Sequence, residues 1–318
     1  MRAPLLLHKE VVSVEGFNGS VETSTMFRGN QPLSDTSPYD QFIDNTKAIN
    51  RIYLGQAVTG ENTLQSTLEP ELAALVVLGY MSAVESYIRA LVRRLIEVDD
   101  MVHTLVEPMT VSFGAARHHS RQLLPEALTE HVSFAGSSGL TTFSTMVGIQ
   151  NFPQDMQKIR GDFLKICEIR HCCVHRFGRL GSKTAFALGT AAHKDLLEKP
   201  FHPSIDELQT ISAALLHFVQ KLNNFLYQTL LERIPVQEAA LENSKYTWYW
   251  ENMWAKDKKK FTAYYNIFST QTGAGSSRPA KEVYQTFQHY LTSKKNPRSG
   301  NQQGGRRRSS GAEQNQAQ

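Results

Sequence analysis

Three long stretches of this chain place apolar residues at the spacing of an α-helix, and they restrict it to a mostly helical fold. They cover residues 70–98, 153–174 and 204–233. Pro70 suits the first turn of the first helix, and the residues Ser-Ile-Asp-Glu from Ser204 have the form of a capping box at the start of the third. Pro235 ends the third pattern, because proline cannot continue a helix.

Weaker patterns surround these three helices and divide the chain into regions. Shorter helices are predicted over residues 39–52, 119–131, 237–254 and 279–292. A strand or hairpin is expected over 11–19, and Gly136 and Gly139 indicate loops in the middle of the chain. We therefore expect four regions, namely an N-terminal extension (1–60), a helical domain (61–235), a C-terminal helical appendage (236–292) and a disordered basic tail (293–318).

The composition is that of an ordinary globular protein, with 41% hydrophobic residues and a formal net charge of +4. Any binding of nucleic acid must therefore depend on a local patch of charge. Cys167, Cys172 and Cys173 are too closely spaced to form a disulfide framework, which favours a reducing, intracellular setting. No apolar run approaches the roughly 20 residues of a membrane span. The apolar run among the first ten residues is too short for a signal peptide. We expect a cytoplasmic protein with no membrane partner.

The second long helix ends in a dense group of polar residues. Residues 168–178 read Glu-Ile-Arg-His-Cys-Cys-Val-His-Arg-Phe-Gly, and so place ionisable side chains inside an apolar helix. Such groups are costly to bury, so their density calls for a functional reason. From Lys158 to Lys183 there are seven basic side chains and only two acidic ones, Asp162 and Glu168. This local excess of positive charge is typical of a surface that binds phosphate.

Arg170 and His175 together supply the chemistry that RNA cleavage by the neighbouring 2′-hydroxyl requires. Histidine titrates near neutral pH and can move the protons of the attacking and leaving oxygens. The planar guanidinium of arginine matches the oxygens of a charged phosphorane. Five positions on a helix correspond to about 140° of rotation, so the two side chains do not point the same way. Either the helix end is distorted near Gly178, or a second copy of the site completes it.

The same residues resemble a known family. Residues 170–175, Arg-His-Cys-Cys-Val-His, resemble the Arg-polar-x-x-x-His motif of the HEPN superfamily, as found in its RiboL-PSP-like and abortive-infection members. The Val-His-Arg-Phe-Gly of residues 174–178 is similar to the usual end of that motif helix. Residues 83–89, Ala-Val-Glu-Ser-Tyr-Ile-Arg, resemble the first long helix of the family. The resemblance covers about residues 70–235.

This resemblance implies an all-α bundle of about four or five helices, here with an N-terminal strand or loop extension and added C-terminal helices. It implies a metal-independent endoribonuclease without a cofactor, whose products carry 2′,3′-cyclic phosphate ends. The expected partners are RNA and a second copy of the chain, in a homodimer or a higher oligomer. A role in toxin–antitoxin pairs or anti-phage defence, with an antitoxin or another subunit of a defence complex, follows from the family alone.

The resemblance also implies roles for single residues. Arg170 would hold the phosphate, His175 would act as general base or acid, and His171 would assist. Apart from the resemblance, Glu85 could pair with Arg170 or orient a histidine, and an exposed polar role is equally compatible with its position. The set of residues expected to bind substrate is Arg176, Arg179, Lys165 and Glu85.

Other interpretations of the same residues remain open. A binding or scaffold module could use the basic surface to hold RNA or a nucleotide, or to assemble a defence complex, without turnover. Glu168, His171 and His175 could form a metal site of a hydrolase, although no second ligand cluster stands out and we expect no metal. The cysteines are expected to fill space in the core. The aromatic run of residues 246–250 is expected to belong to an amphipathic helix that packs on the other helices.

Overall fold

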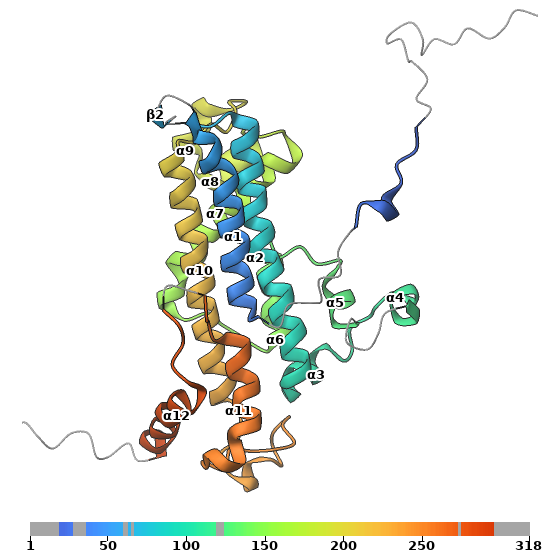
Figure 1. Ribbon diagram of the computed structural model, residues 1–318, viewed down its shortest axis with the longest axis vertical. Helices are drawn as coiled ribbons and strands as arrows, with labels where there is room; N and C mark the ends of the chain where they lie inside the picture. Colours follow the sequence, from blue (N-terminus) through green and yellow to red (C-terminus); the bar gives the residue numbers. More distant parts are fainter. Residues whose placement is uncertain are drawn as a thin grey trace, which may run out of the picture. The chain divides into compact units, whose positions relative to one another are not determined.

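The computed structural model divides the chain into two units, Met1–Asp35 and Thr36–Gln318. The residues that it describes are 19–27, 36–59, 63–64, 67–118, 124–272 and 275–295 (Figure 1). The described part of the first unit holds the short 3₁₀-helix η2 (Thr23–Thr25), which Glu22 caps by accepting the Ser24 N–H. The hairpin predicted over 11–19 lies outside the described residues, apart from Gly19.

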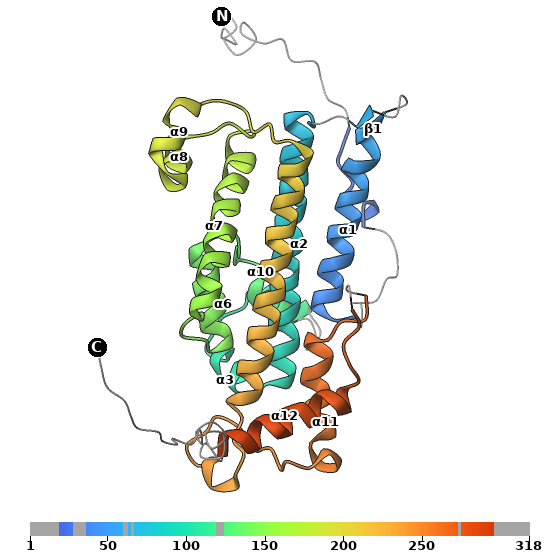
Figure 2. The same ribbon diagram turned by 90° about the vertical axis from the view of Figure 1, so that its left-hand side faces the viewer.

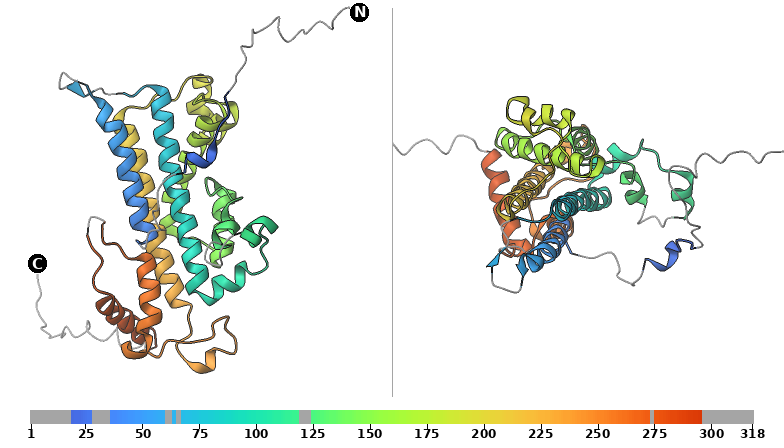
Figure 3. Two further views of the ribbon diagram at one scale, coloured as in Figure 1. Left: turned by 45° about the vertical axis from the view of Figure 1, so that its right-hand side comes forward. Right: turned by 90° about the horizontal axis from the view of Figure 1, so that it is seen from above.

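The second unit is mostly helical, as the sequence predicts. Its four longest helices are α1 (Pro38–Ala57), α2 (Pro70–Val98), α7 (Gln154–His175) and α10 (Ile205–Glu232). These helices pack on one another, and Figures 2 and 3 show them running side by side. The described strands are the two-residue β1 (Val58–Thr59) and β2 (Thr63–Leu64), which form an antiparallel pair after α1.

The long helices begin and end close to where the sequence predicts. Pro70 occupies the first turn of α2, and Pro153 is the N-terminal cap residue of α7. At the start of α10 the predicted capping box is present, because the Ser204 hydroxyl accepts the Glu207 N–H and the Glu207 carboxylate accepts the Ser204 N–H. These helix starts depend on a few neighbouring residues, so they could be predicted without knowledge of the rest of the fold.

Helix α2 lies in the middle of the core. Its buried side chains include Val84, Ile88 and Leu91, all 0% exposed. Of the helices that the structure describes, α2 is the one long and apolar enough to cross a membrane, and 61% of its most apolar window is buried inside the protein. A core helix of a bundle has the same composition, because packing on all sides requires apolar residues on all sides.

The middle of the second unit contains more helix than the sequence predicts. Its short helices are α3 (Asp100–Val106), α4 (Phe113–His118), α5 (Leu124–Thr129), α6 (Ser137–Val147), α8 (Ser182–Leu188), α9 (Thr190–His193) and the 3₁₀-helix η3 (Lys194–Leu196). The prediction of a loop around Gly136 and Gly139 was wrong for α6. A Cβ atom at Gly139 would lie 2.2 Å from the Ser133 carbonyl oxygen, so glycine is needed here for close packing of two backbones.

The helix predicted over 237–254 was also wrong. Only the 3₁₀-helix η4 (Glu238–Ala240) forms there, and α11 (Trp254–Phe268) begins where the predicted helix should end. The aromatic run instead docks side chain by side chain, with Tyr246 and Trp250 buried and the Trp250 indole N–H donating to the Leu231 carbonyl. The last helix, α12 (Ala280–Lys295), extends three residues into the predicted tail, and the rest of that tail lies outside the described residues.

A buried polar cluster around Asp99 joins α3, the end of α10 and α11, which meet in the lower part of Figure 2. Asp99 is 1% exposed and caps α3 by accepting the Val102 N–H. Its carboxylate also accepts hydrogen bonds from Arg233 at 2.7 Å, Tyr246 at 3.0 Å and Tyr264 at 2.9 Å. Helix α1, before the predicted boundary at residue 60, and helix α11, after that at residue 235, belong to the same unit as α2 and α10. The division into four regions stays a prediction.

Candidate functional site

Packing of α7 against α10 and α2 decides which of its side chains reach solvent. Phe163 stacks on Phe218 of α10, with ring centroids 4.2 Å apart and an angle of 9° between the planes. One and two turns further on, Cys167 and Cys172 are buried, together with Cys173. The three cysteines are free thiols in the core, as predicted. The other side of the helix end carries the candidate catalytic residues.

His171 and His175 form a pair on that side. Their ring centroids lie 4.6 Å apart, with the ring planes tilted by 52°. His171 is half-buried and His175 is exposed. The prediction that these residues share one face is confirmed, because four positions bring two side chains one above the other on a helix. The imidazole of His175 is thus accessible from solvent.

Arg170 lies on an adjacent part of the helix surface and is half-buried. Among the described residues, no hydrogen bond or ion pair of its guanidinium is found, either to the histidines or to another group. The helix stays regular to its end, since the Arg176 N–H donates to the Cys172 carbonyl at 3.0 Å. Distortion of the helix end therefore does not bring Arg170 and His175 together within one chain.

The charges near Cys167 include Arg170 and the carboxylates of Glu168 and Glu85. Burial raises the pKa of the Cys167 thiol to about 12, and the charges of Glu168 and Glu85 act in the same direction, whereas Arg170 opposes them. Glu85 of α2 thus approaches this part of α7. Its carboxylate is nevertheless engaged by Arg89, at 3.6 Å, and by the Ser133 hydroxyl, at 3.1 Å.

The remaining residues expected to bind substrate lie near the motif but have protein partners. Lys165 is exposed and pairs with Asp162, one turn away, at 3.0 Å. The Arg176 guanidinium forms an ion pair of 2.5 Å with the Glu198 carboxylate, and Arg179 donates to the Glu198 carbonyl at 2.8 Å. Glu198 was not predicted from the sequence, because it follows these arginines by about twenty residues in a segment without a motif.

Backbone hydrogen bonds also join the two ends of residues 178–201, the segment that carries α8 and α9. The Leu180 N–H donates to the Lys199 carbonyl, the Glu198 N–H donates to the Leu180 carbonyl, and the Phe201 N–H donates to the Gly178 carbonyl. The segment leaves the end of α7 and returns to the start of α10, and Figure 2 shows it beyond the end of α7. Arg176 and Arg179 thus help to hold this segment in place.

The turn after α7 exposes a phenylalanine in an uncommon backbone conformation. Phe177 has a φ of 52° and Gly178 a φ of 79°, and the Gly178 N–H donates to the Cys172 carbonyl. The left-handed region is costly for a bulky residue, whereas Gly178 adopts it readily. The Phe177 side chain is 80% exposed, as is that of Phe186 on α8, and Val174 is 44% exposed. These exposed apolar side chains, two of them within or just after the motif, were not predicted from the sequence.

The metal-site interpretation finds no support in the geometry. Over the described residues, no group of three or more histidine, cysteine, aspartate or glutamate side chains is arranged to hold a metal ion. Glu168, His171 and His175 therefore do not form a set of three converging ligands.

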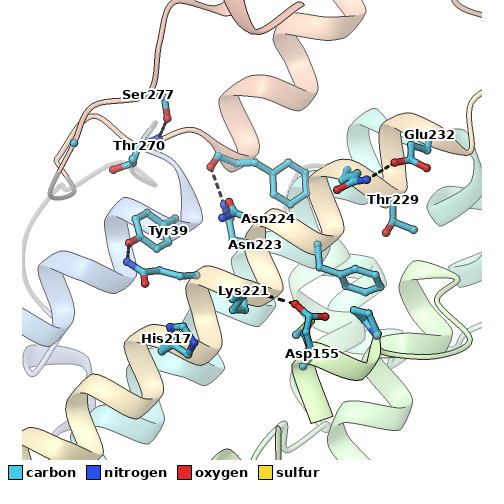
Figure 4. A pocket seen from close by; sticks show the side chains of 17 residues that line it. Tyr39, Asp155, His217, Lys221, Asn223, Asn224, Thr229, Glu232, Thr270 and Ser277 are labelled. Carbon is cyan, nitrogen blue, oxygen red and sulfur yellow. Dashed lines mark hydrogen bonds and ion pairs between the residues drawn. The ribbon is translucent and has the colours of Figure 1, made fainter. Parts of the chain in front are cut away.

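A larger groove of about 760 Å³ lies along α10, away from the motif (Figure 4). Asp155 and Lys221 form an ion pair of 3.6 Å on one wall. Gln220 donates to the Tyr39 hydroxyl, and the Asn223 amide donates to the Phe268 carbonyl. These polar groups join α10 to α1, α7 and α11, and they do not form a nucleophile with its base.

No protein-family model, curated protein or solved structure matches this chain.

Proposed function

We propose that this protein is a metal-independent endoribonuclease of the HEPN type. One observation carries the proposal. At the end of α7, a histidine pair with ring centroids 4.6 Å apart adjoins an arginine that has no partner among the described residues. Proton transfer groups and a free cation are the two requirements of 2′-hydroxyl attack on a phosphodiester.

The roles of the residues follow from their exposure. His175 reaches solvent and takes the proton of the 2′-hydroxyl or gives one to the leaving 5′-oxygen. His171 is half-buried beneath it and positions its ring or the reacting phosphate. Arg170 stabilises the negative charge that develops on the phosphorane, because the planar fork of a guanidinium matches the phosphate oxygens.

A second copy of the chain completes the site in this proposal. Arg170 and His175 are about 140° apart around a regular helix, so one chain does not direct both at one phosphate. Val174, within the motif, and Phe177, two residues after it, are exposed apolar side chains that a partner would bury. A homodimer with two motifs facing one cleft satisfies both observations. Mass measurement by light scattering on the wild type and Phe177→Ser tests this arrangement.

Substitution of the motif residues tests the catalytic assignment. Arg170→Ala and His175→Ala should each lower the rate of RNA cleavage by about 10²–10⁴-fold, the usual contribution of such groups. His217→Ala and Arg51→Ala are matched controls, because both residues are exposed on other helices. If Arg170→Ala and His175→Ala fold and still cleave at the wild-type rate, the assignment is wrong.

The second candidate function is a non-catalytic RNA-binding, nucleotide-binding or scaffold subunit of a defence complex. One observation favours it, namely that Arg176 and Arg179 are engaged by Glu198 and so add little to a substrate site within one chain. Toxin–antitoxin and anti-phage roles, with an antitoxin or an activating subunit, belong to either candidate. RNA that binds the wild type but is never cut, even with the natural partner present, would favour the scaffold.

A further inference from the structure

A cavity of about 590 Å³ lies between α3, α6 and the first turns of α7. Leu105, Leu140 and Phe152 contribute apolar surface to it, and Ser144 and Asn151 contribute neutral polar groups. Arg160 is the one charged residue among those that line the cavity, which include no carboxylate. The cavity therefore combines a single positive charge with an apolar wall, and its volume lies within the roughly 300–1,000 Å³ of small-molecule sites.

The state of Arg160 differs from that of Arg89 and Arg93, which are also partly buried. Arg89 donates to the carbonyls of Thr129 and Val132, and Arg93 pairs with Glu126 at 3.1 Å. By contrast, the Nε atom of Arg160 is buried and has no hydrogen-bond partner in the described part of the chain. A buried guanidinium N–H without a partner is uncommon, and an unseen anion or water is an established reason for it.

The neutral polar groups of the cavity wall are also available for a ligand. No hydrogen bond of the Ser144 hydroxyl or the Asn151 amide occurs within the described residues, whereas Thr145 donates to the Thr141 carbonyl. Hydroxyl and amide groups donate to phosphate oxygens alongside an arginine fork. The apolar wall would face the part of the ligand that carries no charge.

We infer that this cavity binds a phosphate monoester that carries an uncharged, flat ring system, such as a nucleoside monophosphate. The Arg160 guanidinium binds the phosphate through paired N–H donors, and the ring system lies against Leu105, Leu140 and Phe152. Arg160 and Arg170 are ten residues apart on α7, about 15 Å along the helix, so this site is separate from the motif. The inference does not depend on ribonuclease activity.

Calorimetric titration with AMP tests the inference on the full-length protein. Wild type should bind AMP, and Arg160→Gln should weaken binding by at least about tenfold, because it removes a charge-assisted hydrogen bond. Lys158→Gln is the matched control, since it removes the same charge from the same helix at an exposed residue outside the cavity. Thr145→Trp, at an exposed position of the wall, should also abolish binding by filling the cavity without changing the charge.

Adenosine and Arg170→Ala distinguish a phosphate site at Arg160 from a purely apolar cavity and from binding at the motif. Adenosine should bind at least about tenfold more weakly than AMP, because it lacks the phosphate. Arg170→Ala should bind AMP like the wild type. Three results would each overturn the inference: no saturable AMP binding to wild type at millimolar concentrations, equal binding by Arg160→Gln and wild type, or loss of binding in Arg170→Ala alone.

Discussion

The histidine pair at the end of α7 depends on the buried residues between its members. Cys172 and Cys173 are buried in the core. His171 is half-buried and His175 is exposed, and their rings lie next to each other. Small thiols suit these positions because they fill little volume close to the neighbouring helices. The contrast between buried thiols and outward-facing imidazoles is thus a property of one helical turn.

Burial predicts that the cysteines are unreactive in the folded protein. Burial raises the pKa of Cys167 and of Cys173 to about 12, so almost no thiolate exists at pH 8. We expect iodoacetamide to leave both unmodified in the native state and to modify both in denaturant, as measured by mass spectrometry. Rapid alkylation of either residue in the native protein at pH 8 would contradict the packing of α7.

Single residues also show what could be predicted from the sequence. The contact between His171 and His175 follows from their spacing and could be predicted without a structure. The ion pair of Arg176 with Glu198 could not, because it depends on the turn at Phe177 and on the return of a segment without a motif. Contacts between distant residues require the backbone path that joins them.

At the scale of elements, the short helix α6 shows the limit of reading glycine as a loop signal. Gly139 allows the start of α6 to approach the backbone of Ser133 and Phe134, and this approach cannot be inferred from local pattern. The long helices α2, α7 and α10 were predicted because their apolar periodicity extends over many turns. The irregular segment before α11 escaped prediction because its aromatic residues dock individually.

Two glycine substitutions test the packing of these helices. Gly139→Ala would place its Cβ 2.2 Å from a carbonyl oxygen, and should lower the free energy of unfolding by roughly 1–3 kcal/mol or more. Gly161→Ala, in the interior of α7 with open space around the site, should raise it by up to about 1 kcal/mol. Urea denaturation measures both, and equal effects of the two substitutions would contradict the close approach at Gly139.

The N-terminus of α1 provides a prediction of pH dependence. Asp40 is 2% exposed, and burial alone would raise its pKa. Hydrogen bonds from Thr270, Gln271 and Thr272 outweigh burial and lower the pKa below its ordinary value of 3.8. The folded state therefore binds this proton more weakly than the unfolded state, so the stabilisation is present above about pH 4 and is lost as the pH falls through the lowered pKa.

Asp40→Asn should remove that contribution. We expect its free energy of unfolding at pH 7 to fall by about 1–3 kcal/mol, and its stability to change less than that of the wild type between pH 5 and pH 2. Asp44→Asn is the control, because Asp44 is exposed on the same helix. Parallel stability curves of wild type and Asp40→Asn in acid would show that Asp40 does not anchor the segment after α11.

At the scale of the whole molecule, the Asp99 cluster connects helices that are far apart in sequence. Arg233 follows α10 and donates to the Asp99 carboxylate, to the Tyr246 hydroxyl and to the carbonyl of Val147, the last residue of α6. A carboxylate that is 1% exposed needs such partners, since an unpaired buried charge is strongly destabilising. This cluster makes the segment after residue 235 part of the same unit as the long helices.

Arg233→Ala should therefore destabilise the whole unit. Loss of one member of a buried ion pair costs about 3–5 kcal/mol, and we expect a single, cooperative unfolding transition at lower denaturant concentration. Arg278→Ala is a suitable control, because Arg278 is exposed and its guanidinium donates to the exposed Thr286 hydroxyl on α12. A loss below about 1 kcal/mol for Arg233→Ala would mean that the cluster does not hold these helices together.

The helical class of the molecule could be predicted from the sequence, and the meeting of its parts around Asp99 could not. Periodicity reports which face of a helix is buried but not which partner buries it. The same limit applies to the candidate site, because the motif and its basic neighbours are local, whereas the second chain proposed to complete it would leave no pattern in one sequence. The exposure of Val174, Phe177 and Phe186 became visible only with the fold.

The most direct test of the proposed ribonuclease is to determine the RNA ends that the purified protein produces in the presence of EDTA. We predict cleavage that persists in chelator, yields 2′,3′-cyclic phosphate and 5′-hydroxyl ends, and is lost in His175→Ala but not in His217→Ala. Products with 5′-phosphate ends, a requirement for a divalent metal, or full activity of folded His175→Ala would contradict the proposed function.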